Sequence, residues 1–382
     1  MAHILHISCD YQDSIAGRKT RAVNNLVAAA DDFEHTVLSL NRSSRPGRSG
    51  LVRHDGNVFA MHFFALPFGL GLRYFLARLT RRLRCILREN DINPDIIHCH
   101  KLSYEGPLGR TLAAEIGIPY VLSIRGDTDL KLIRFKPTYR RWYRDTLAAA
   151  DAVFFIAPWA RAKISDMWPD SLPEHVRLLP NIVELAATGQ HGSGTSTRLV
   201  CVAHLKEYRR KNISGLLQAV DACSDSNAEL TLDIIGTGPE ASLAAVHKLI
   251  QKMAHPGRVR LLGHLERNEI ADRLPDYAAL VLPSRRETFG MVYVEALQAG
   301  IPFLHSRNAG VDGYFTDLDV SIAVDPDSIR SIADGIALLL DSQDYFKTNI
   351  RELRDSGYLD QFSTAAVART YTDTVNTVLA TR

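Results

Sequence analysis

The chain has 382 residues, of which 46% are hydrophobic and 23% are charged, and its formal net charge is +2. This length is enough for two domains that each have a core, and the composition excludes a disordered or fibrous protein. A nearly balanced charge argues against a dedicated nucleic-acid binder.

The N-terminal stretch MAHILHISCD enters an apolar strand directly, without the basic region and long apolar region of a signal peptide. No apolar run approaches the ~20 residues that a membrane-spanning helix requires. The five cysteines are scattered and show neither a disulfide framework nor a zinc spacing. We therefore expect a reduced, cytoplasmic protein.

The first half of the chain alternates short apolar strands with helical segments. The strands read HILHIS, HTVLSL, DIIHCH, IPYVLSI and AVFFI, and helices are expected near residues 17–30, near residues 72–88 and after Tyr104. This alternation predicts an α/β domain with a doubly wound parallel sheet, which we place at residues 1–184.

A stretch rich in Gly, Ser and Thr, LAATGQHGSGTSTR, follows this domain and predicts a linker at residues 185–197. The alternation then restarts with LVCVA, LTLDIIG, VRLLG, ALVLP and PFLHS, which predicts a second α/β domain at residues 198–358. The last segment, residues 359–382, is helical in pattern. We expect it to cross back and pack on the first domain.

The helix expected at residues 72–88 is basic and amphipathic, because its arginines alternate with leucines and other apolar residues. Two interpretations stay open. The apolar stripe can pack on the sheet with the arginines solvated, or the arginine face can rest on anionic lipid head groups, where each cation contributes about 1 kcal/mol at most.

Two kinds of motif raise the question of a metal ion. His98 and His100 stand on one side of a predicted strand, but no further ligand occurs at a recognisable spacing. Asp-x-Asp pairs occur at residues 127–129, 317–319 and 325–327. Three matches in one chain show that this short motif arises easily by chance, so it is weak evidence for a metal site. We therefore predict no metal site.

The stretch SRRETFGMVYVEALQAGIPF places Glu287 and Glu295 in a mostly apolar segment. YAALVLP before it predicts a buried strand, and a helix is expected to start near Met291 and to end at Gly300, before Pro302. Free amides at the start of such a helix suit phosphate or hydroxyl oxygens. Each carboxylate alone also fits a structural role, in a solvated turn or near a helix start.

A cluster of cations, HLKEYRRKN, lies between the first strand and the first helix of the second domain. At the carboxyl end of a strand, such cations suit a diphosphate leaving group, although a solvated basic loop has the same composition.

Together these motifs resemble glycosyltransferase family 4, a large group of retaining enzymes with the GT-B fold. They occur in the family's order as PDIIHCH, IPYVLSIRG, ADAVFFIAP, LPNIVE, LVCVAHL, LTLDIIGTGP, VRLLGHL and LPSRRETFGMVYVEALQAGIPF. The last is the most specific, because it matches the family's E-x7-E element. The resemblance implies two Rossmann-like domains that face a central cleft.

The resemblance also implies roles for individual residues. Glu287 is expected to bind hydroxyls of the donor sugar, Glu295 the ribose, and Lys211 the diphosphate. The implied donor-binding set is completed by Gly17, Asn181, His204, Arg209, Arg210, Phe289, Gly290 and Met291, where the last three act through their amides. Glu287, Lys211 and Arg125 are the predicted catalytic residues.

Three positions depart from the family pattern. His204 stands where the family has an arginine, so Arg209 or Arg210 is the candidate replacement. Arg125 stands in place of a histidine and is a permanent cation that cannot act as a base. Ala16 and Gly17 replace two adjacent glycines.

The activity implied is transfer of a hexose, with retention, from a nucleotide diphosphate sugar to a hydroxyl acceptor, such as a lipid-linked glycan. No metal or other cofactor is expected, and the partners are the donor, the acceptor and, through residues 72–88, an anionic membrane on its inner face. Two alternatives stay open: a nucleotide-sugar epimerase of the 2-epimerase type, and a catalytically silent scaffold that binds nucleotide sugar.

Overall fold

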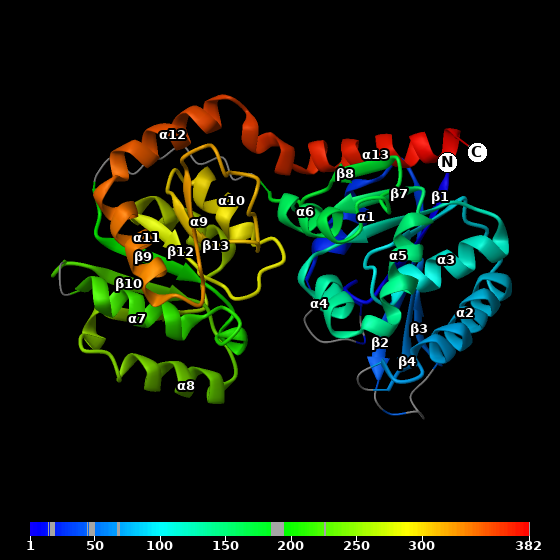
Figure 1. Cartoon of the computed structure of the whole chain (residues 1–382), viewed down its shortest axis with the longest axis horizontal. Coiled ribbons are helices and arrows are strands. Elements are labelled where there is room, and N and C mark those ends of the chain that lie inside the picture. The colour runs from blue at the N-terminus through cyan, green and yellow to red at the C-terminus, as the bar shows by residue number, and fades with distance from the viewer. Residues whose placement is uncertain are drawn as a thin grey trace. The chain divides into compact units, whose positions relative to one another are not determined.

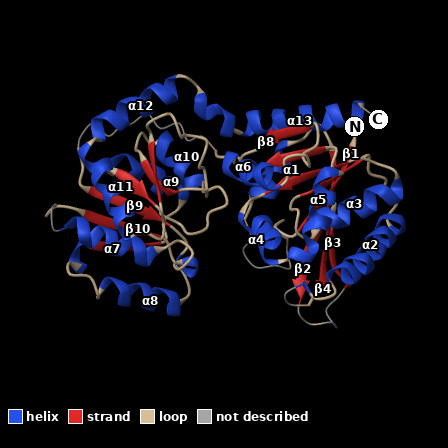
Figure 2. Cartoon of the chain, in the orientation of Figure 1, coloured by secondary structure: helices blue, strands red, loops and turns tan. Residues whose placement is uncertain are grey.

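The computed structural model describes residues 1–381 except for 14, 16–19, 44, 46–49, 67–68, 185–194 and 225–226. It divides into two compact α/β units (Figures 1 and 2). The first unit comprises Met1–Ile156, Ala160–Ile182 and Thr364–Arg382, and the second comprises Ala157–Trp159 and Val183–Ser363. The linker predicted at residues 185–197 lies largely outside the described residues.

The first unit is built on an eight-stranded sheet with the order β3-β4-β2-β1-β5-β6-β7-β8. Its strands are β1 (His3–Ser8), β2 (Glu34–Ser43), β3 (Gly50–Asp55), β4 (Val58–Phe64), β5 (Ile96–Cys99), β6 (Tyr120–Ile124), β7 (Ala152–Phe155) and β8 (His175–Leu178). Neighbouring strands run parallel, except that β3 pairs antiparallel with β4 at the edge. Strand β1 lies between β2 and β5, so the direction in which strands are added reverses there.

The connections of the first unit are mostly helical, as the alternation predicts. They are α1 (Ala22–Ala29), α2 (Leu72–Glu89), α3 (Glu105–Ile116), α4 (Asp127–Phe135), η3 (Pro137–Tyr139), α5 (Arg140–Ala148) and α6 (Pro158–Met167). The central strands β5, β6 and β7 are buried along their whole length. Burial on both faces explains why these strands read as continuous apolar runs.

The C-terminal helix α13 (Thr364–Ala380) packs on the first unit, as predicted (Figure 1). Val367, Tyr371, Val375 and Val378 are buried in one cluster with residues of β1, α1, β5 and β7. The Tyr371 hydroxyl lies 2.9 Å from His98 Nδ1. Each of these four residues is at most 1% exposed, so the helix completes the core of this unit.

The second unit is built on a six-stranded parallel sheet with the order β11-β10-β9-β12-β13-β14. Its strands are β9 (Arg198–Val202), β10 (Thr231–Ile235), β11 (Val259–Gly263), β12 (Ala279–Val281), β13 (Phe303–Ser306) and β14 (Ser321–Val324). Its helices are η4 (Leu205–Glu207), α7 (Ile213–Ser224), α8 (Glu240–Ile250), η5 (Pro256–Arg258), α9 (Arg267–Arg273), η6 (Leu274–Asp276), α10 (Met291–Gln298), α11 (Ile329–Asp341), α12 (Gln343–Asp355) and η7 (Tyr358–Phe362). Here the order reverses at β9, which lies between β10 and β12.

Among the helices of the described residues, none combines the length and the apolar character that crossing a membrane requires.

The packing of α13 leads to a stability prediction. Replacing Tyr371 with Ala removes a fully buried ring and leaves a cavity, so we expect the free energy of unfolding to fall by about 3 to 5 kcal/mol. Chemical denaturation of the full chain measures this change. Asn376→Ala, at an exposed position of the same helix, should change stability little. Equal stability of both variants would contradict this account of the core.

Candidate functional site

The second unit brings two predicted residues together at the point where its strand order reverses. Strands β9 and β12 are neighbours, and their connections leave toward opposite sides of the sheet. Lys211 lies on the connection after β9, and Glu287 lies on the connection after β12. The Lys211 ammonium and the Glu287 carboxylate form a short ion pair there.

The ion pair is largely buried and is held by its surroundings. The side chains of Lys211 and Glu287 are only 17% and 9% exposed. The Thr288 amide donates to Glu287 Oε1 at 3.1 Å. The two loops are joined by further bonds, from the Arg285 amide to the Arg210 carbonyl and from Arg210 Nε to the Arg286 carbonyl, both 3.0 Å long. Such support is what a desolvated ion pair needs in order to persist.

Helix α10 begins at Met291 and its end is followed by Gly300, as the sequence predicts. Gly290 precedes it in the left-handed conformation with a φ of 79°, and a Cβ there would lie 2.4 Å from the Tyr293 ring. Phe289 is fully buried, so the turn is anchored in the core. The first amides of α10 have no partner within the helix, which leaves them able to bind oxygen atoms.

Glu295 has a partner that the sequence did not indicate. Arg267, from α9, lies 3.2 Å from the Glu295 carboxylate and also pairs with Glu184. Burial raises the pKa of Glu295, and the guanidinium of Arg267 opposes that shift. No spacing rule links α9 with α10, so only the tertiary structure shows this contact.

The other predicted cations of the second unit lie at the carboxyl end of β9. His204 is exposed and caps η4, where its Nδ1 accepts a bond of 3.3 Å from the Lys206 amide. Arg209 is exposed and stacks over the Tyr208 ring. Arg210 bonds to the Glu287 loop, so it is the predicted replacement cation that lies beside the ion pair.

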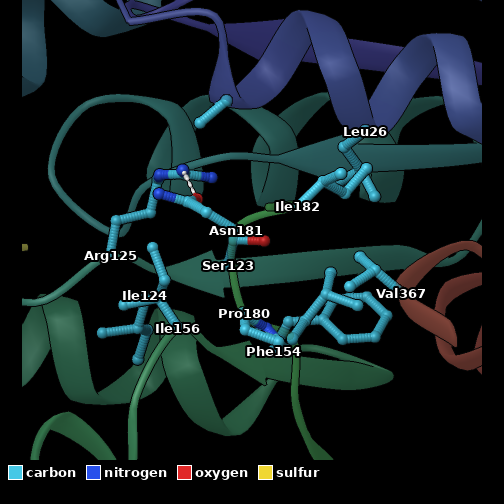
Figure 3. Close-up of a pocket in the computed structure, with 12 residues that line it drawn as sticks. Leu26, Ser123, Ile124, Arg125, Phe154, Ile156, Pro180, Asn181, Ile182 and Val367 are labelled. Atoms are coloured by element: carbon cyan, nitrogen blue, oxygen red, sulfur yellow. Dashed lines mark hydrogen bonds between the residues drawn. The ribbon is translucent and has the colours of Figure 1, made fainter. Parts of the chain in front are cut away.

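The first unit contains the remaining predicted residues. Figure 3 shows the Arg125 and Asn181 side chains pointing toward one another, and Arg125 donates a hydrogen bond of 2.6 Å to Asn181 Oδ1. The pocket around them, bordered by Leu26 of α1 and Val367 of α13, has a volume of only about 10 Å³. This space fits about one water molecule and no sugar. Gly17 lies outside the described residues.

A polar cluster in the first unit was not predicted from the sequence. It lies after β1 and β5, where the strand order of this sheet reverses. Lys101 pairs with Asp10 at 2.5 Å, and Glu105 at the start of α3 accepts a bond of 2.6 Å from the Cys9 amide. The other oxygen of Glu105, Oε2, is buried and has no hydrogen-bond partner among the described residues.

Two buried carboxyl groups at this cluster, Glu105 and the nearby Asp129, have raised pKa values. Burial raises the pKa of Glu105 to about 8, although Lys101 opposes the shift. Burial also raises the pKa of Asp129 to about 6, although its carboxylate accepts bonds from the amides of Ser103 and Arg125. Perturbed groups of this kind gather at functional sites, and this cluster lies where α/β sheets bind ligands.

The two histidines of DIIHCH belong to a larger group of imidazoles. His6 of β1 joins His98 of β5 and His100, which directly follows β5, and candidate ligand atoms of the three lie within 4.8 Å of one another. They are the only group of three potential metal ligands found among the described residues, and no Asp-x-Asp pair is part of such a group. The sequence could not show His6, because it lies on another strand.

The hydrogen bonds of these imidazoles show which ring nitrogen donates and which accepts. His35 Nε2 donates to the Ala30 carbonyl at 2.7 Å, so its Nδ1 is free to accept from His6 Nε2 at 2.9 Å. His6 Nδ1 then accepts from His100 Nε2 at 3.0 Å. Burial lowers the pKa of His98 to about 3 and lowers those of His6 and His100 well below the usual value. The three buried imidazoles are therefore neutral. His100, His6 and His35 form a hydrogen-bonded chain, whereas His98 bonds to the hydroxyls of Tyr371 and Ser123.

Comparison with known families identifies the chain. Residues 20–181 match the glycosyl transferase 4-like domain, and residues 189–354 match the glycosyl transferases group 1 family. The chain belongs to the GT-B glycosyltransferases of family 4. The Lys211–Glu287 pair of this glycosyltransferase lies in the group 1 part, and the cluster around Glu105 lies in the 4-like part.

Similar proteins extend over most of this glycosyltransferase. D-inositol 3-phosphate glycosyltransferase of Corynebacterium glutamicum is 25% identical over 373 residues, which cover 89% of this chain and 86% of the relative. The solved sucrose-phosphate synthase of Thermosynechococcus elongatus has a TM-score of 0.74 at 18% identity and 100% coverage of each chain. An E. coli trehalose-6-phosphate protein solved with bound UDP-2-fluoro glucose has a TM-score of 0.69 at 13% identity, with 99% of each chain covered. At these identities the structural likeness supports the fold alone.

The raised pKa of Glu105 predicts a dependence of stability on pH. Between about pH 4.5 and 8, the folded enzyme keeps a proton that the unfolded chain has released. Its free energy of unfolding, relative to that of Glu105→Gln, should therefore fall as the pH rises, by about 1.4 kcal/mol per pH unit at most. Denaturation curves across this range measure the difference, with Glu115→Gln on the same helix as the control. Parallel curves for the native chain and Glu105→Gln would contradict the buried, protonated state.

Proposed function

We propose that this glycosyltransferase transfers a hexose from a nucleotide diphosphate sugar to a hydroxyl of a lipid-linked glycan, with retention at the anomeric carbon. The observation that carries the proposal is the buried Lys211–Glu287 pair at the start of α10, where the strand order reverses. Two similar proteins support a nucleotide sugar as donor and a hydroxylated acceptor. One structural neighbour was solved with UDP-2-fluoro glucose, and one relative is a D-inositol 3-phosphate glycosyltransferase.

Each group at this position suits one part of such a donor. The Glu287 carboxylate accepts hydrogen bonds from sugar hydroxyls, and the amides at Phe289, Gly290 and Met291 donate to sugar and phosphate oxygens. Lys211 exchanges its bond with Glu287 for one with the diphosphate, because a dianion attracts it more strongly than a single carboxylate. Glu295, held by Arg267, takes the ribose hydroxyls.

The proposed reaction breaks the bond between the anomeric carbon and the diphosphate oxygen and forms a bond to the acceptor oxygen. Charge separates as the sugar becomes cationic and the diphosphate takes up negative charge, so preorganised cations lower the barrier. Lys211 and Arg210 are the candidates for this role. The departing phosphate accepts the acceptor proton on the same face, which conserves the anomeric configuration without a protein base.

We further propose that the enzyme works without a metal ion on the cytoplasmic face of a membrane. The cations after β9 supply the charge that a divalent ion supplies in other transferases. Helix α2 offers a membrane-binding face, because Arg73, Arg78, Arg81, Arg82 and Arg88 are exposed. Among the described ion pairs, only Arg84 of this helix has an acidic partner, Glu115.

A panel of nucleotide sugars tests the donor and the role of Glu287. We expect one sugar to bind and to be hydrolysed slowly without acceptor, with unchanged rates in the presence of a chelator. Glu287→Ala should lower turnover by about 10² to 10³-fold, because it removes contacts that orient the sugar. Glu240→Ala, an exposed carboxylate at the start of α8, is the matched control. Absence of any donor binding would refute the proposal, and solvent deuterium entering the sugar without acceptor would indicate an epimerase instead.

Vesicle sedimentation tests the membrane face. Replacing Arg81 and Arg88 with Gln should weaken binding to vesicles that contain anionic lipid by about 1 kcal/mol per arginine. The exposed pair Arg330 and Arg351 of the second unit, changed in the same way, removes equal charge from another surface. Equal losses in both double variants would mean that α2 is not the membrane-binding element.

A further inference from the structure

A groove in the first unit lies between β4 and α2. Its volume is about 560 Å³, which is within the range of ligand-binding pockets. Its apolar lining comes from Met61, Phe63 and Phe64 of β4 and from Phe75 and Leu79 of α2. The rings of Phe64 and Phe75 meet edge to face, with centroids 5.0 Å apart. The groove therefore offers a continuous hydrocarbon-like surface.

Two arginines from α2 line the same groove. Arg78 and Arg82 are one helical turn apart, both are exposed, and neither is part of a described ion pair. Arg78 also donates to the Tyr74 hydroxyl at 3.3 Å, and Tyr74 lines the groove as well. A ligand that complements this lining has an apolar chain and an anionic head of phosphate type, because guanidinium groups bind phosphate oxygens in pairs.

The surface around the groove is suited to a membrane interface. Leu70, Tyr74 and Phe135 are 69%, 58% and 71% exposed, although large apolar residues are usually covered. The Tyr139 hydroxyl donates to the Gly69 carbonyl at 3.0 Å, which holds the segment after α4 against the start of α2. Exposed aromatic and aliphatic side chains among arginines are typical of surfaces that enter the head-group region.

One ring contact leads from the groove toward the polar cluster of the first unit. It follows β4 to the carboxyl end of that strand, and parallel strands share one edge of the sheet. The Phe63 ring packs against Tyr104 with centroids 5.7 Å apart, and Tyr104 directly precedes Glu105. Phe63 and Tyr104 therefore lie between a chain in the groove and the cluster formed by Asp10, Lys101 and Glu105.

We infer that this groove binds the hydrocarbon chain of a lipid phosphate, with the phosphate held by Arg78 and Arg82. The inference rests on the proposed lipid-linked acceptor and specifies which part of the enzyme holds its lipid. The sugar carried on that phosphate then extends toward the cluster around Glu105. Arg78 and Arg82 thus belong both to the exposed face of α2 and to the groove, whereas Arg73, Arg81 and Arg88 do not line the groove.

Binding of decyl phosphate, kept below its micelle concentration, tests the inference on the full chain by calorimetry. We expect saturable binding of one molecule per chain. Arg78→Gln combined with Arg82→Gln should weaken it at least about tenfold, because two charge-assisted contacts are lost. Arg81→Gln combined with Arg88→Gln removes the same charge from the same helix outside the groove and should change the affinity less than about twofold. Equal losses in both pairs, or no saturable binding, would overturn the inference.

Chemical controls separate the contributions of chain and head. Inorganic phosphate lacks the chain and decyl maltoside lacks the charge, so both should bind far more weakly than decyl phosphate. Equal binding of decyl maltoside would show an unspecific apolar surface and would overturn the inference. A diazirine placed on the chain of the phosphate should label peptides that contain Met61, Phe64 or Phe75, and labelling confined to other peptides would also overturn it.

Donor hydrolysis, measured without acceptor, distinguishes failure of this inference from failure of the proposed function. The Arg78 and Arg82 variants should hydrolyse the donor at the native rate, since neither residue belongs to the proposed donor-binding or catalytic set. Native donor hydrolysis without decyl phosphate binding would refute the groove and leave the transferase activity standing. Decyl phosphate binding without any donor binding would refute the transferase and leave a lipid-phosphate site.

Discussion

In each sheet, the first strand is hydrogen-bonded on both sides by strands that extend the sheet in opposite directions, β2 and β5 around β1, and β10 and β12 around β9. The connections that follow such a pair diverge to opposite faces, so no helix covers the end of the sheet between them. Lys211 and Glu287 meet at one of these openings, and Asp10, Lys101 and Glu105 meet at the other. The topology thus determines where buried charge is tolerated and where a ligand has access to it.

The buried charges are compensated to different extents at the two openings. In the second unit, Lys211 and Glu287 neutralise one another, and the loops that carry them are bonded together. In the first unit, Lys101 forms its ion pair with Asp10. One buried oxygen of Glu105 therefore has no partner among the described residues. Burying an uncompensated carboxylate is costly, so its proton is retained and its pKa rises. Groups kept in such states are frequent where a protein binds a substrate.

Helix α2 has a buried apolar side and an exposed basic side. Its leucines are buried against the sheet and hold the first unit together, while most of its arginines are exposed without acidic partners in the described part of the chain. The two interpretations of this basic helix are therefore compatible, because they concern opposite faces. Packing explains the apolar stripe but supplies no acidic partner for the arginines. Two of them line the groove, where their charge suits an anionic ligand.

Local pattern was enough to predict most of the alternating strands and helices, the start of α10 at Met291, the return of the C-terminal helix and the family. It did not predict β3, β4 or β8. The predicted features depend on periodicity, on Gly and Pro signals and on motif order, and all of these can be read directly from the sequence. Contacts between distant segments were decided only by the tertiary structure. Arg267 beside Glu295, His6 beside His100, Glu105 beside Cys9 and the groove along α2 each join residues from separate elements. No spacing predicts them, because strand order and helix packing determine which residues become neighbours.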